Sequence, residues 1–209
     1  MSRAHAWRRK PPPVVRELLE KVPESRFYVV REIGPTAFVI KGEESSRPYR
    51  VQIGAEQSCS CKTSPELCIH ILFVMLKIYR IPPTNPVVWQ QSLLDDEITQ
   101  ILTGRLQRQA SDDKPKPAAS SSSGVERRAV DDVCPICYDD MNEDDLLVYC
   151  KTGCGNNIHA ACMKIWAGHH KDHLTCPMCR AEWGPFVMPK APPDRKKRAA
   201  GPSHAHAHA

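Results

Sequence analysis

Seven cysteines between positions 134 and 179, together with one histidine among them, His159, constrain the fold more than any other feature of the sequence. In order along the chain they are Cys134, Cys137, Cys150, Cys154, His159, Cys162, Cys176 and Cys179. A structural zinc ion takes four sulfur or nitrogen ligands in a tetrahedron, so eight ligands predict two closed zinc sites. Two cysteines separated by two residues, as in CPIC and CPMC, can present both sulfurs from one tight turn.

A further set of four ligands lies upstream, in the segment CSCKTSPELCIH. It consists of Cys59, Cys61, Cys68 and His70. Alternate residues of an extended strand point to opposite faces, so the chain must turn at Ser60 to direct both sulfurs at one ion. The three sets together predict three Zn²⁺ ions and use all ten cysteines.

Composition favours small metal-stabilised modules over one large core. The 209 residues include 19 prolines, and only 6% of the chain is aromatic. The first 13 residues lack the apolar region of a secretory signal, and the apolar stretch around residues 71–81 is interrupted by Lys77 and Arg80. We therefore expect no membrane partner and a reducing cytoplasmic or nuclear compartment, where clustered cysteines bind metal.

The formal net charge of +5 overstates how basic the protein is. Ten thiolates and three zinc dications together lower the charge to about +1. The remaining basic runs are local, at Arg8–Lys10 and at Arg195–Arg198, where RKKR fits either a short nuclear address or a solvated tail. A nucleic-acid partner is therefore not favoured.

The remaining pattern predicts helices and strands around the upstream ligands. A helix is expected at 14–22, with Val14, Val15, Leu18, Leu19 and Val22 on one face. Strands are expected at 27–32, 36–41 and 49–53. After His70 a helix is expected to pack Ile71, Leu72, Met75, Leu76 and Tyr79 against those strands. A further helix is expected at 95–106, with acidic residues in its first turn.

Two resemblances follow from these motifs. The C-x-C, spacer, C-x-H pattern, with strands before it and an apolar helix after it, resembles the SWIM zinc finger. The order of the eight downstream ligands resembles the RING and PHD families. That resemblance implies interleaved sites, one formed by Cys134, Cys137, His159 and Cys162 and the other by Cys150, Cys154, Cys176 and Cys179. The alternative donors His169, His170 and His173 are expected in a solvated loop.

Residues that are not ligands favour RING over PHD. PHD fingers usually carry a tryptophan two residues before the seventh ligand, and this chain has Leu174 there. RING ubiquitin ligases carry an apolar residue in the first CxxC, an aromatic residue on the central helix, a proline in the last CxxC and a "linchpin" cation after it. The corresponding residues here are Ile136, Trp166, Pro177 and Arg180.

The residues around these ligands give a more specific resemblance. The segments GCGNNIHAACMKIW and CPMCR look like the RING of MEKK-related ligases, and FYVVREIGPTAFVIK resembles the SWIM–RING ubiquitin ligases of the MEX (MEKK-related protein X) type. The resemblance covers roughly residues 25–187. Vertebrate members continue into a ZZ finger and a second RING, which these 209 residues do not include, so those functions are not carried over.

The resemblance implies a ubiquitin ligase that recruits a ubiquitin-charged conjugating enzyme. Ile136, Trp166 and Pro177 would bind the conjugating enzyme, and Arg180 would hold enzyme and ubiquitin in the reactive conformation. The SWIM domain would bind a protein substrate. Two rival interpretations are a zinc-finger adaptor without ligase activity (a PHD-like chromatin reader, or a protein or DNA binder acting through SWIM) and a scaffold whose RING only dimerises.

The expected fold is α+β, with two small zinc-stabilised modules joined by a disordered linker. Residues 1–24 form a basic, proline-rich arm, disordered over 1–13, and a short helix. Residues 25–108 form the SWIM zinc-finger domain and 109–130 the Ser/Pro linker. Residues 131–187 form a cross-brace RING, and 188–209 a disordered basic and His-rich tail.

Overall fold

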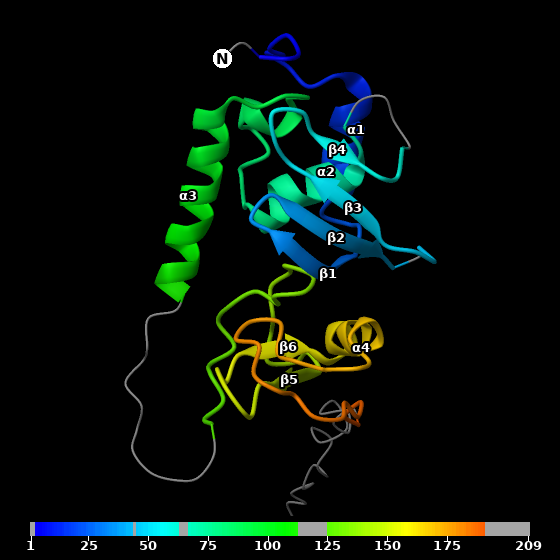
Figure 1. Ribbon diagram of the computed structural model, residues 1–209, viewed down its shortest axis with the longest axis vertical. Helices are drawn as coiled ribbons and strands as arrows, with labels where there is room; N and C mark the ends of the chain where they lie inside the picture. Colours follow the sequence, from blue (N-terminus) through cyan, green and yellow to red (C-terminus); the bar gives the residue numbers. More distant parts are fainter. Residues whose placement is uncertain (1–2, 44, 63–66, 113–124, 191–209) are drawn as a thin grey trace, which may run out of the picture.

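The computed structural model describes residues 3–43, 45–62, 67–112 and 125–190. The chain forms two modules, each with its own apolar core and its own small antiparallel sheet. The N-terminal module ends with a long helix, and the C-terminal module packs beneath its sheet (Figure 1). The mixed α+β architecture expected from the sequence is confirmed. The predicted basic run at Arg195–Arg198 lies outside the described residues.

A four-stranded antiparallel sheet forms the frame of the N-terminal module. Its strands follow the order β1-β2-β3-β4. Their bounds are β1 (Phe27–Gly34), β2 (Ala37–Gly42), β3 (Tyr49–Gln52) and β4 (Ser58–Cys59). Because β1 stands at one end of this order, its outer edge pairs with no other strand in the described part of the chain. The three longer strands were predicted, whereas β4 is too short to give a sequence pattern.

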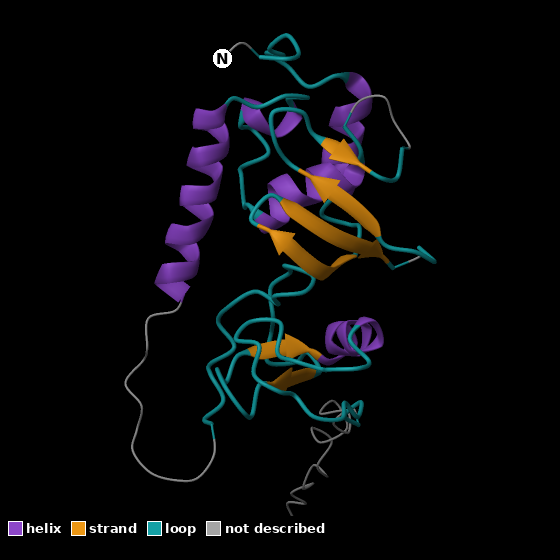
Figure 2. Ribbon diagram, viewed as in Figure 1, coloured by secondary structure: helices purple, strands orange, loops and turns teal. Residues whose placement is uncertain are grey.

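The helices of this module lie against one face of the sheet and, in the case of α3, beside it (Figure 2). They are α1 (Pro13–Lys21), α2 (Ile69–Phe73), the π-helical turn η1 (Val74–Ile78), the 3₁₀ turn η2 (Pro86–Trp89) and α3 (Asp95–Asp112). The helix predicted after His70 is present as α2 and η1. Its expected apolar residues pack in the core: Ile71, Leu72, Met75 and Tyr79 are buried, and Leu76 is partly buried.

Two expectations about the N-terminal end were wrong. Val14 is 56% exposed, so Val15 is the buried residue of α1, with Val22 buried directly after the helix and Leu18 and Leu19 partly buried. The arm before α1 is also ordered rather than disordered over residues 3–12. The backbone N–H of Arg8 donates to the Gln90 side chain at 3.0 Å, and Trp89 donates to the Arg8 carbonyl at 3.0 Å.

The linker between the modules is shorter than expected from composition. Helix α3 continues to Asp112, well past the predicted end at residue 106. On the other side, residues 125–130 already belong to the C-terminal module, because the buried amide of Asn157 donates to the carbonyls of Arg128 and Ala129 at 2.9 and 3.1 Å. Of the predicted linker, residues 113–124 lie outside the described part of the chain.

The C-terminal module is built from a two-stranded sheet and one helix. The elements are β5 (Leu147–Tyr149), β6 (Asn157–His159) and α4 (Ala160–His169). Its core is small: Ile136, Met141, Ile158 and Met163 are buried together with three cysteines. A core of this size does not stabilise a domain without an additional cross-link.

The two modules are in direct contact along the outer edge of β1. The backbone N–H of Val29 donates to the carbonyl of Ile136 at 2.7 Å. Tyr28 of β1 is a member of the C-terminal core, and Tyr138 of the C-terminal module packs against the N-terminal core. Each module thus inserts one tyrosine into the other.

Polar contacts flank this apolar exchange. Lys77 and Asp139 form an ion pair at 2.8 Å. The guanidinium of Arg105, on α3, donates to both carboxylate oxygens of Glu32 at 2.9 and 2.8 Å and lies 3.4 Å from the Tyr138 hydroxyl. We call the whole contact, formed by Tyr28, Val29, Glu32, Lys77 and Arg105 on one side and Ile136, Tyr138 and Asp139 on the other, the seam.

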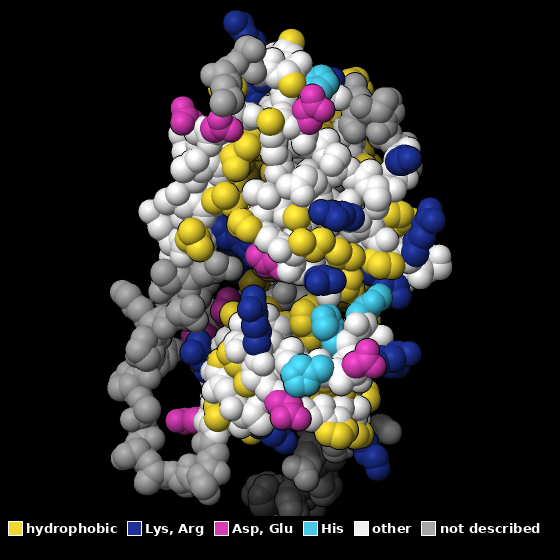
Figure 3. All heavy atoms as spheres, viewed as in Figure 1, with side chains coloured by type: hydrophobic (Ala, Val, Ile, Leu, Met, Phe, Trp, Pro, Cys, Tyr) yellow, Lys and Arg dark blue, Asp and Glu magenta, His cyan; other side chains and the backbone are white. Residues whose placement is uncertain are grey.

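Charged side chains of both signs are mixed on the face of the molecule drawn in Figure 3. On the face shown in Figure 3, Lys and Arg side chains are spread over both modules rather than gathered over the sheet. Among the described residues, no helix combines the length and apolar character that crossing a membrane requires.

Candidate functional site

Three clusters of sulfur and nitrogen atoms match the three ligand sets expected from the sequence. Within each cluster the candidate atoms all lie within 4.8 Å of one another. The sets are Cys59, Cys61, Cys68 and His70; Cys134, Cys137, His159 and Cys162; and Cys150, Cys154, Cys176 and Cys179. The downstream ligands are interleaved, because the first and third pairs along the chain meet, as do the second and fourth.

The separations within the clusters fit tetrahedral zinc. Sulfur ligands about 2.3 Å from a tetrahedral ion lie about 3.8 Å apart. The Cys150–Cys179 and Cys154–Cys176 sulfur atoms are each 3.8 Å apart. The chain therefore carries three Cys/His clusters that can bind zinc.

Repeated tight turns aim the cysteines at each cluster. In CPIC the N–H of Tyr138 donates to the Cys134 carbonyl at 2.8 Å, and in CPMC the N–H of Arg180 donates to the Cys176 carbonyl at 3.0 Å. The residue after the second cysteine has positive φ in both turns, 59° at Tyr138 and 61° at Arg180. The two CxxC segments are therefore copies of one turn, which we call the first and second knuckle.

At least one thiol in each cluster has a pKa below that of an ordinary cysteine. A hydrogen bond with Cys59 lowers the pKa of Cys68 to about 4, and one with Cys176 lowers the pKa of Cys154 to about 5. Burial acts to raise the pKa of Cys134, but hydrogen bonds from neighbouring thiols outweigh it and bring the pKa well below its usual value. Zinc binds thiolate, so these hydrogen bonds favour the form of sulfur that the metal requires.

Neighbouring side chains orient the two histidines. The Nδ1 atom of His159 faces Cys137 at 3.4 Å, and its Nε2 atom lies 3.5 Å from a carboxylate oxygen of Asp145. A carboxylate behind a ligand histidine fixes the ring and its tautomer. His70 is held instead by aromatic rings, with its centroid 5.2 Å from that of Phe27 and 4.6 Å from that of Tyr49.

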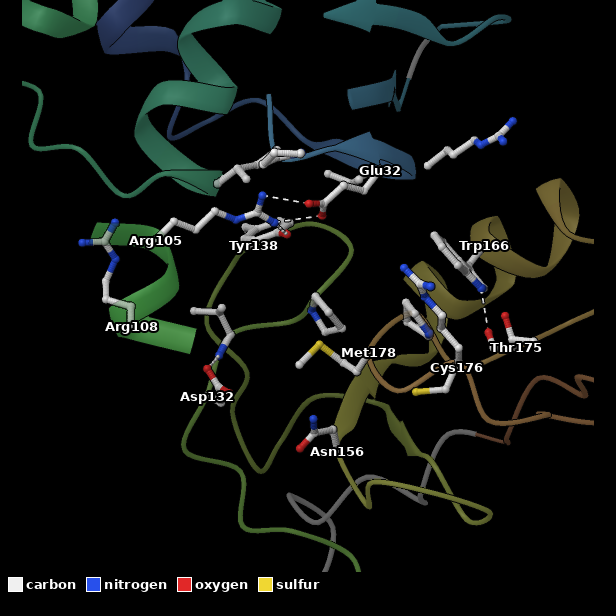
Figure 4. Close-up of a pocket in the computed structure, with 18 of the residues that line it drawn as sticks. Glu32, Arg105, Arg108, Asp132, Tyr138, Asn156, Trp166, Thr175, Cys176 and Met178 are labelled. Atoms are coloured by element: carbon white, nitrogen blue, oxygen red, sulfur yellow. Dashed lines mark hydrogen bonds and ion pairs between the residues drawn. The ribbon is translucent and has the colours of Figure 1, made fainter. Parts of the chain in front are cut away.

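Three of the four residues expected to contact the conjugating enzyme or ubiquitin line a cleft beside the seam. A cleft of about 780 Å³ between the modules is lined by Trp166, Pro177 and Arg180, and Figure 4 shows it with Arg105 on the left and Trp166 on the right. The indole N–H of Trp166 donates to the Thr175 carbonyl at 2.9 Å, which ties helix α4 to the second knuckle. Arg180 is exposed at the end of that knuckle.

Ile136 differs from these three residues because it is completely buried, with 0% of its surface exposed. It lies under strand β1, whose Val29 binds its carbonyl. The structure thus brings Trp166, Pro177 and Arg180 to one cleft and places Ile136 beneath the N-terminal module.

The histidines after Cys162 have a different environment from the one expected. They do not occupy a solvated loop throughout, because α4 continues to His169. His170 stacks on the Trp166 ring with centroids 3.9 Å apart. Among the described residues, His169, His170 and His173 are in none of the three clusters.

Sequence families match both modules. The Ring finger domain family matches residues 132–180, and the SWIM zinc finger family matches residues 49–79. The two matches enclose the three ligand clusters. The chain carries a SWIM zinc finger and a RING finger, and we refer to it as the SWIM–RING protein. The eight-ligand module contains the RING match, and the module built on β1–β4 contains the SWIM match; we call these modules the RING and the SWIM domain.

Curated proteins resemble this SWIM–RING protein over most of its length. Human Mitogen-activated protein kinase kinase kinase 1 is 32% identical over 190 residues, which cover 79% of this chain and 12% of the relative. Mouse E3 ubiquitin-protein ligase Zswim2 is 37% identical over 183 residues, which cover 78% of this chain and 28% of the relative. The chain therefore spans under a third of the length of either protein.

A third relative matches over a shorter stretch. An uncharacterized RING finger protein of Schizosaccharomyces pombe is 45% identical over 53 residues, which is 25% of this chain and 7% of the relative. No solved structure matches the SWIM–RING protein significantly.

Several residues at the site were missed by sequence reasoning. Tyr28 and Tyr138 look like ordinary core or turn residues in the sequence. That each packs against the core of the other module follows only from the tertiary structure. Asp145 had a weak signal, since it ends the acidic run EDD shortly before β5. Its role behind His159 requires the fold to be known.

Proposed function

We propose that this SWIM–RING protein is a RING-type ubiquitin ligase, which binds a ubiquitin-charged conjugating enzyme and promotes transfer of ubiquitin to a substrate lysine. The observation that supports this best is the convergence of Trp166, Pro177 and Arg180 on one cleft beside the second knuckle. The similarity to a protein named E3 ubiquitin-protein ligase Zswim2 adds support.

The transfer step needs no nucleophile from the ligase. The substrate lysine amine attacks the thioester carbonyl of ubiquitin held on the conjugating enzyme. An amide C–N bond forms, the C–S bond breaks, the enzyme's cysteine leaves as thiolate, and the amine loses a proton. All ten cysteines of this chain lie in the three clusters, so none is left to carry ubiquitin. The ligase acts by orienting the thioester.

Each residue of the site has a separate task in this scheme. Pro177 and Trp166 offer apolar surface for the conjugating enzyme, together with Ile136 once it is uncovered. Arg180 supplies a guanidinium that can donate several hydrogen bonds to conjugating enzyme and ubiquitin at once. The three zinc ions hold the fold and supply no reacting atom.

The SWIM domain would be the arm that binds a protein partner or substrate. Its basic side chains are spread rather than aligned (Figure 3), which supports a protein partner over nucleic acid. The cytoplasm and nucleus both fit a chain of this chemistry.

The decisive experiment is discharge of ubiquitin from a panel of charged conjugating enzymes onto free lysine. The native chain should accelerate discharge with at least one enzyme, and Arg180→Ala should abolish the acceleration while keeping three zinc ions per chain. If no enzyme of the panel is discharged faster while zinc is fully bound, the zinc-finger adaptor without ligase activity is supported instead.

Arg180→Gly is the matched control for folding. Because residue 180 has φ of 61°, glycine relieves the strain that alanine retains. The glycine variant should therefore be more stable than the alanine variant by about 1 kcal/mol, and equally inactive. Full activity in the glycine variant would contradict the linchpin role.

A further inference from the structure

The two knuckles give an internal comparison of exposure. Ile136 in CPIC and Met178 in CPMC occupy the same position, directly before the second cysteine. Both knuckles have the same hydrogen bond and the same positive φ after that cysteine. Met178 is nevertheless 44% exposed and Ile136 is 0% exposed. The turn itself therefore leaves this side chain open to solvent, and something outside the turn covers Ile136.

The cover is strand β1 of the SWIM domain. Its outer edge supplies the Val29 N–H that binds the Ile136 carbonyl at 2.7 Å. Tyr28, which is 5% exposed, packs in the same RING core as Ile136. A conjugating enzyme and β1 cannot both contact Ile136.

The covering arrangement is held from both sides. On one side Lys77 and Asp139 pair at 2.8 Å, with their side chains 27% and 38% exposed. On the other side Arg105 binds Glu32 and lies beside Tyr138, as Figure 4 shows. The Lys77–Asp139 pair crosses between the modules and is partly open to water, whereas Arg105 is buried and pairs with Glu32 on its own side of the seam. A partly exposed ion pair contributes little, so reversing one of its charges can favour opening of the seam.

We propose that the SWIM domain caps the site for the conjugating enzyme, so that the closed seam is a resting state and the enzyme binds fully only when β1 leaves Ile136. This proposal rests on the proposed ligase function. Trp166, Pro177 and Arg180 stay accessible along the cleft in the resting state, whereas Ile136 becomes available on opening. The apparent affinity for the conjugating enzyme is then the intrinsic affinity reduced by the fraction of open molecules.

A charge exchange across the seam tests the cap in the 209-residue chain. Lys77→Glu and Asp139→Lys each place like charges at the position of the ion pair and should favour the open state. The double variant restores an opposite pair with the signs exchanged. Each single variant should bind a ubiquitin-free conjugating enzyme about fivefold more tightly. Each should also release ubiquitin from the ubiquitin-loaded enzyme correspondingly faster. The double variant should return to the native values.

Lys21→Glu is the matched control for charge. Lys21 is an exposed lysine at the end of α1, the helix that lies away from the RING in Figure 1. Its reversal makes the same change in net charge as Lys77→Glu and should leave binding and discharge as in the native chain. Hydrogen exchange at the Val29 amide reports opening without any enzyme, and it should be faster in the two single seam variants only.

The outcomes separate the cap from the ligase activity. If the native chain discharges ubiquitin and the single variants show no gain in binding, rate or Val29 exchange, the cap is wrong and the ligase function stands. If the single variants open the seam, as exchange shows, yet neither they nor the native chain bind any enzyme of the panel, both proposals fail.

Discussion

At the residue scale, the zinc clusters depend on backbone conformations that side chains usually avoid. Lys62, Tyr138, Gly155 and Arg180 each directly follow a ligand cysteine, and each has positive φ. A left-handed residue at this point turns the chain so that the preceding sulfur faces the ion. Three of the four residues are not glycine, so the ligand geometry overrides a local conformational cost.

At Gly155 a side chain would add a steric clash to the conformational cost of positive φ. A Cβ atom there would lie 2.3 Å from the Glu126 carbonyl oxygen, and φ is +72°. Gly155→Ala should destabilise the RING by more than about 2 kcal/mol, combining the conformational cost with the clash. Thermal unfolding and zinc content of the purified variant measure this.

Gly184→Ala is the control for that variant. Gly184 has φ of +73°, and a Cβ atom added there would meet nothing within 4 Å, so alanine carries the conformational cost alone. Its loss should be about 1 kcal/mol. Equal losses at the two positions would show that the approach of Glu126 has no energetic importance.

At the element scale, the start of helix α3 is held by contacts beyond the helix's own backbone hydrogen bonds. The Glu97 carboxylate accepts the Leu94 N–H at 2.8 Å, which is one half of a capping box, and also accepts Arg3 at 2.7 Å. Burial acts to raise the pKa of Glu97, but these hydrogen bonds outweigh it and lower the pKa. The helix start and the N-terminal arm therefore depend on one carboxylate.

Glu97→Ala should lower the free energy of unfolding by about 1 kcal/mol. A lowered pKa in the folded state means that the charged carboxylate stabilises above the unfolded pKa of about 4.3, and that this stabilisation is lost as the pH falls. The difference between native and variant should therefore shrink in acid. Denaturant unfolding at neutral and acidic pH measures both effects. Asp96→Ala, at an exposed position in the same turn, should cost only a few tenths of a kcal/mol, and a loss as large as that of Glu97→Ala would contradict the role of the cap.

At the scale of the whole molecule, the two modules differ in how much of their stability can come from apolar packing. Among the described residues, the SWIM core contains 20 buried residues, of which one is a ligand cysteine. The RING core contains eight, of which three are ligand cysteines and one is Tyr28 from the SWIM domain. Zinc therefore has to supply a larger share of the folding free energy in the RING.

Removal of zinc by a strong chelator should unfold the modules unequally. Hydrogen exchange should show complete loss of protection in β5 and β6, because the RING core is built on its ligands. Amides of β1 and β2 should keep partial protection, because Phe38, Ile40 and their neighbours stay packed. Simultaneous loss of protection in both modules would contradict this difference. Cys61→Ser serves as the converse variant and should lose one zinc ion while leaving β5 and β6 protected.

Much of the local structure was predictable because its causes are local. The C-x-C and CxxC spacings indicate the ligand sets, alternating apolar residues indicate β1–β3, and the apolar run after His70 indicates α2 and η1. The expectation for Val14 failed because the helical pattern alone does not say which side of a broad apolar face meets the sheet. The arm and the ends of the linker were missed because their partners, Gln90 and Asn157, are distant in sequence.

The sequence by itself determined the metal chemistry and the kind of module, since ligand type and spacing decide which ion is bound and which turns present it. Only the tertiary structure decided how the modules meet. Nothing in the sequence around Ile136 distinguishes it from Met178 in exposure, because both stand in the same turn. The edge of β1 covers one and not the other, and burial depends on this packing between segments more than 100 residues apart.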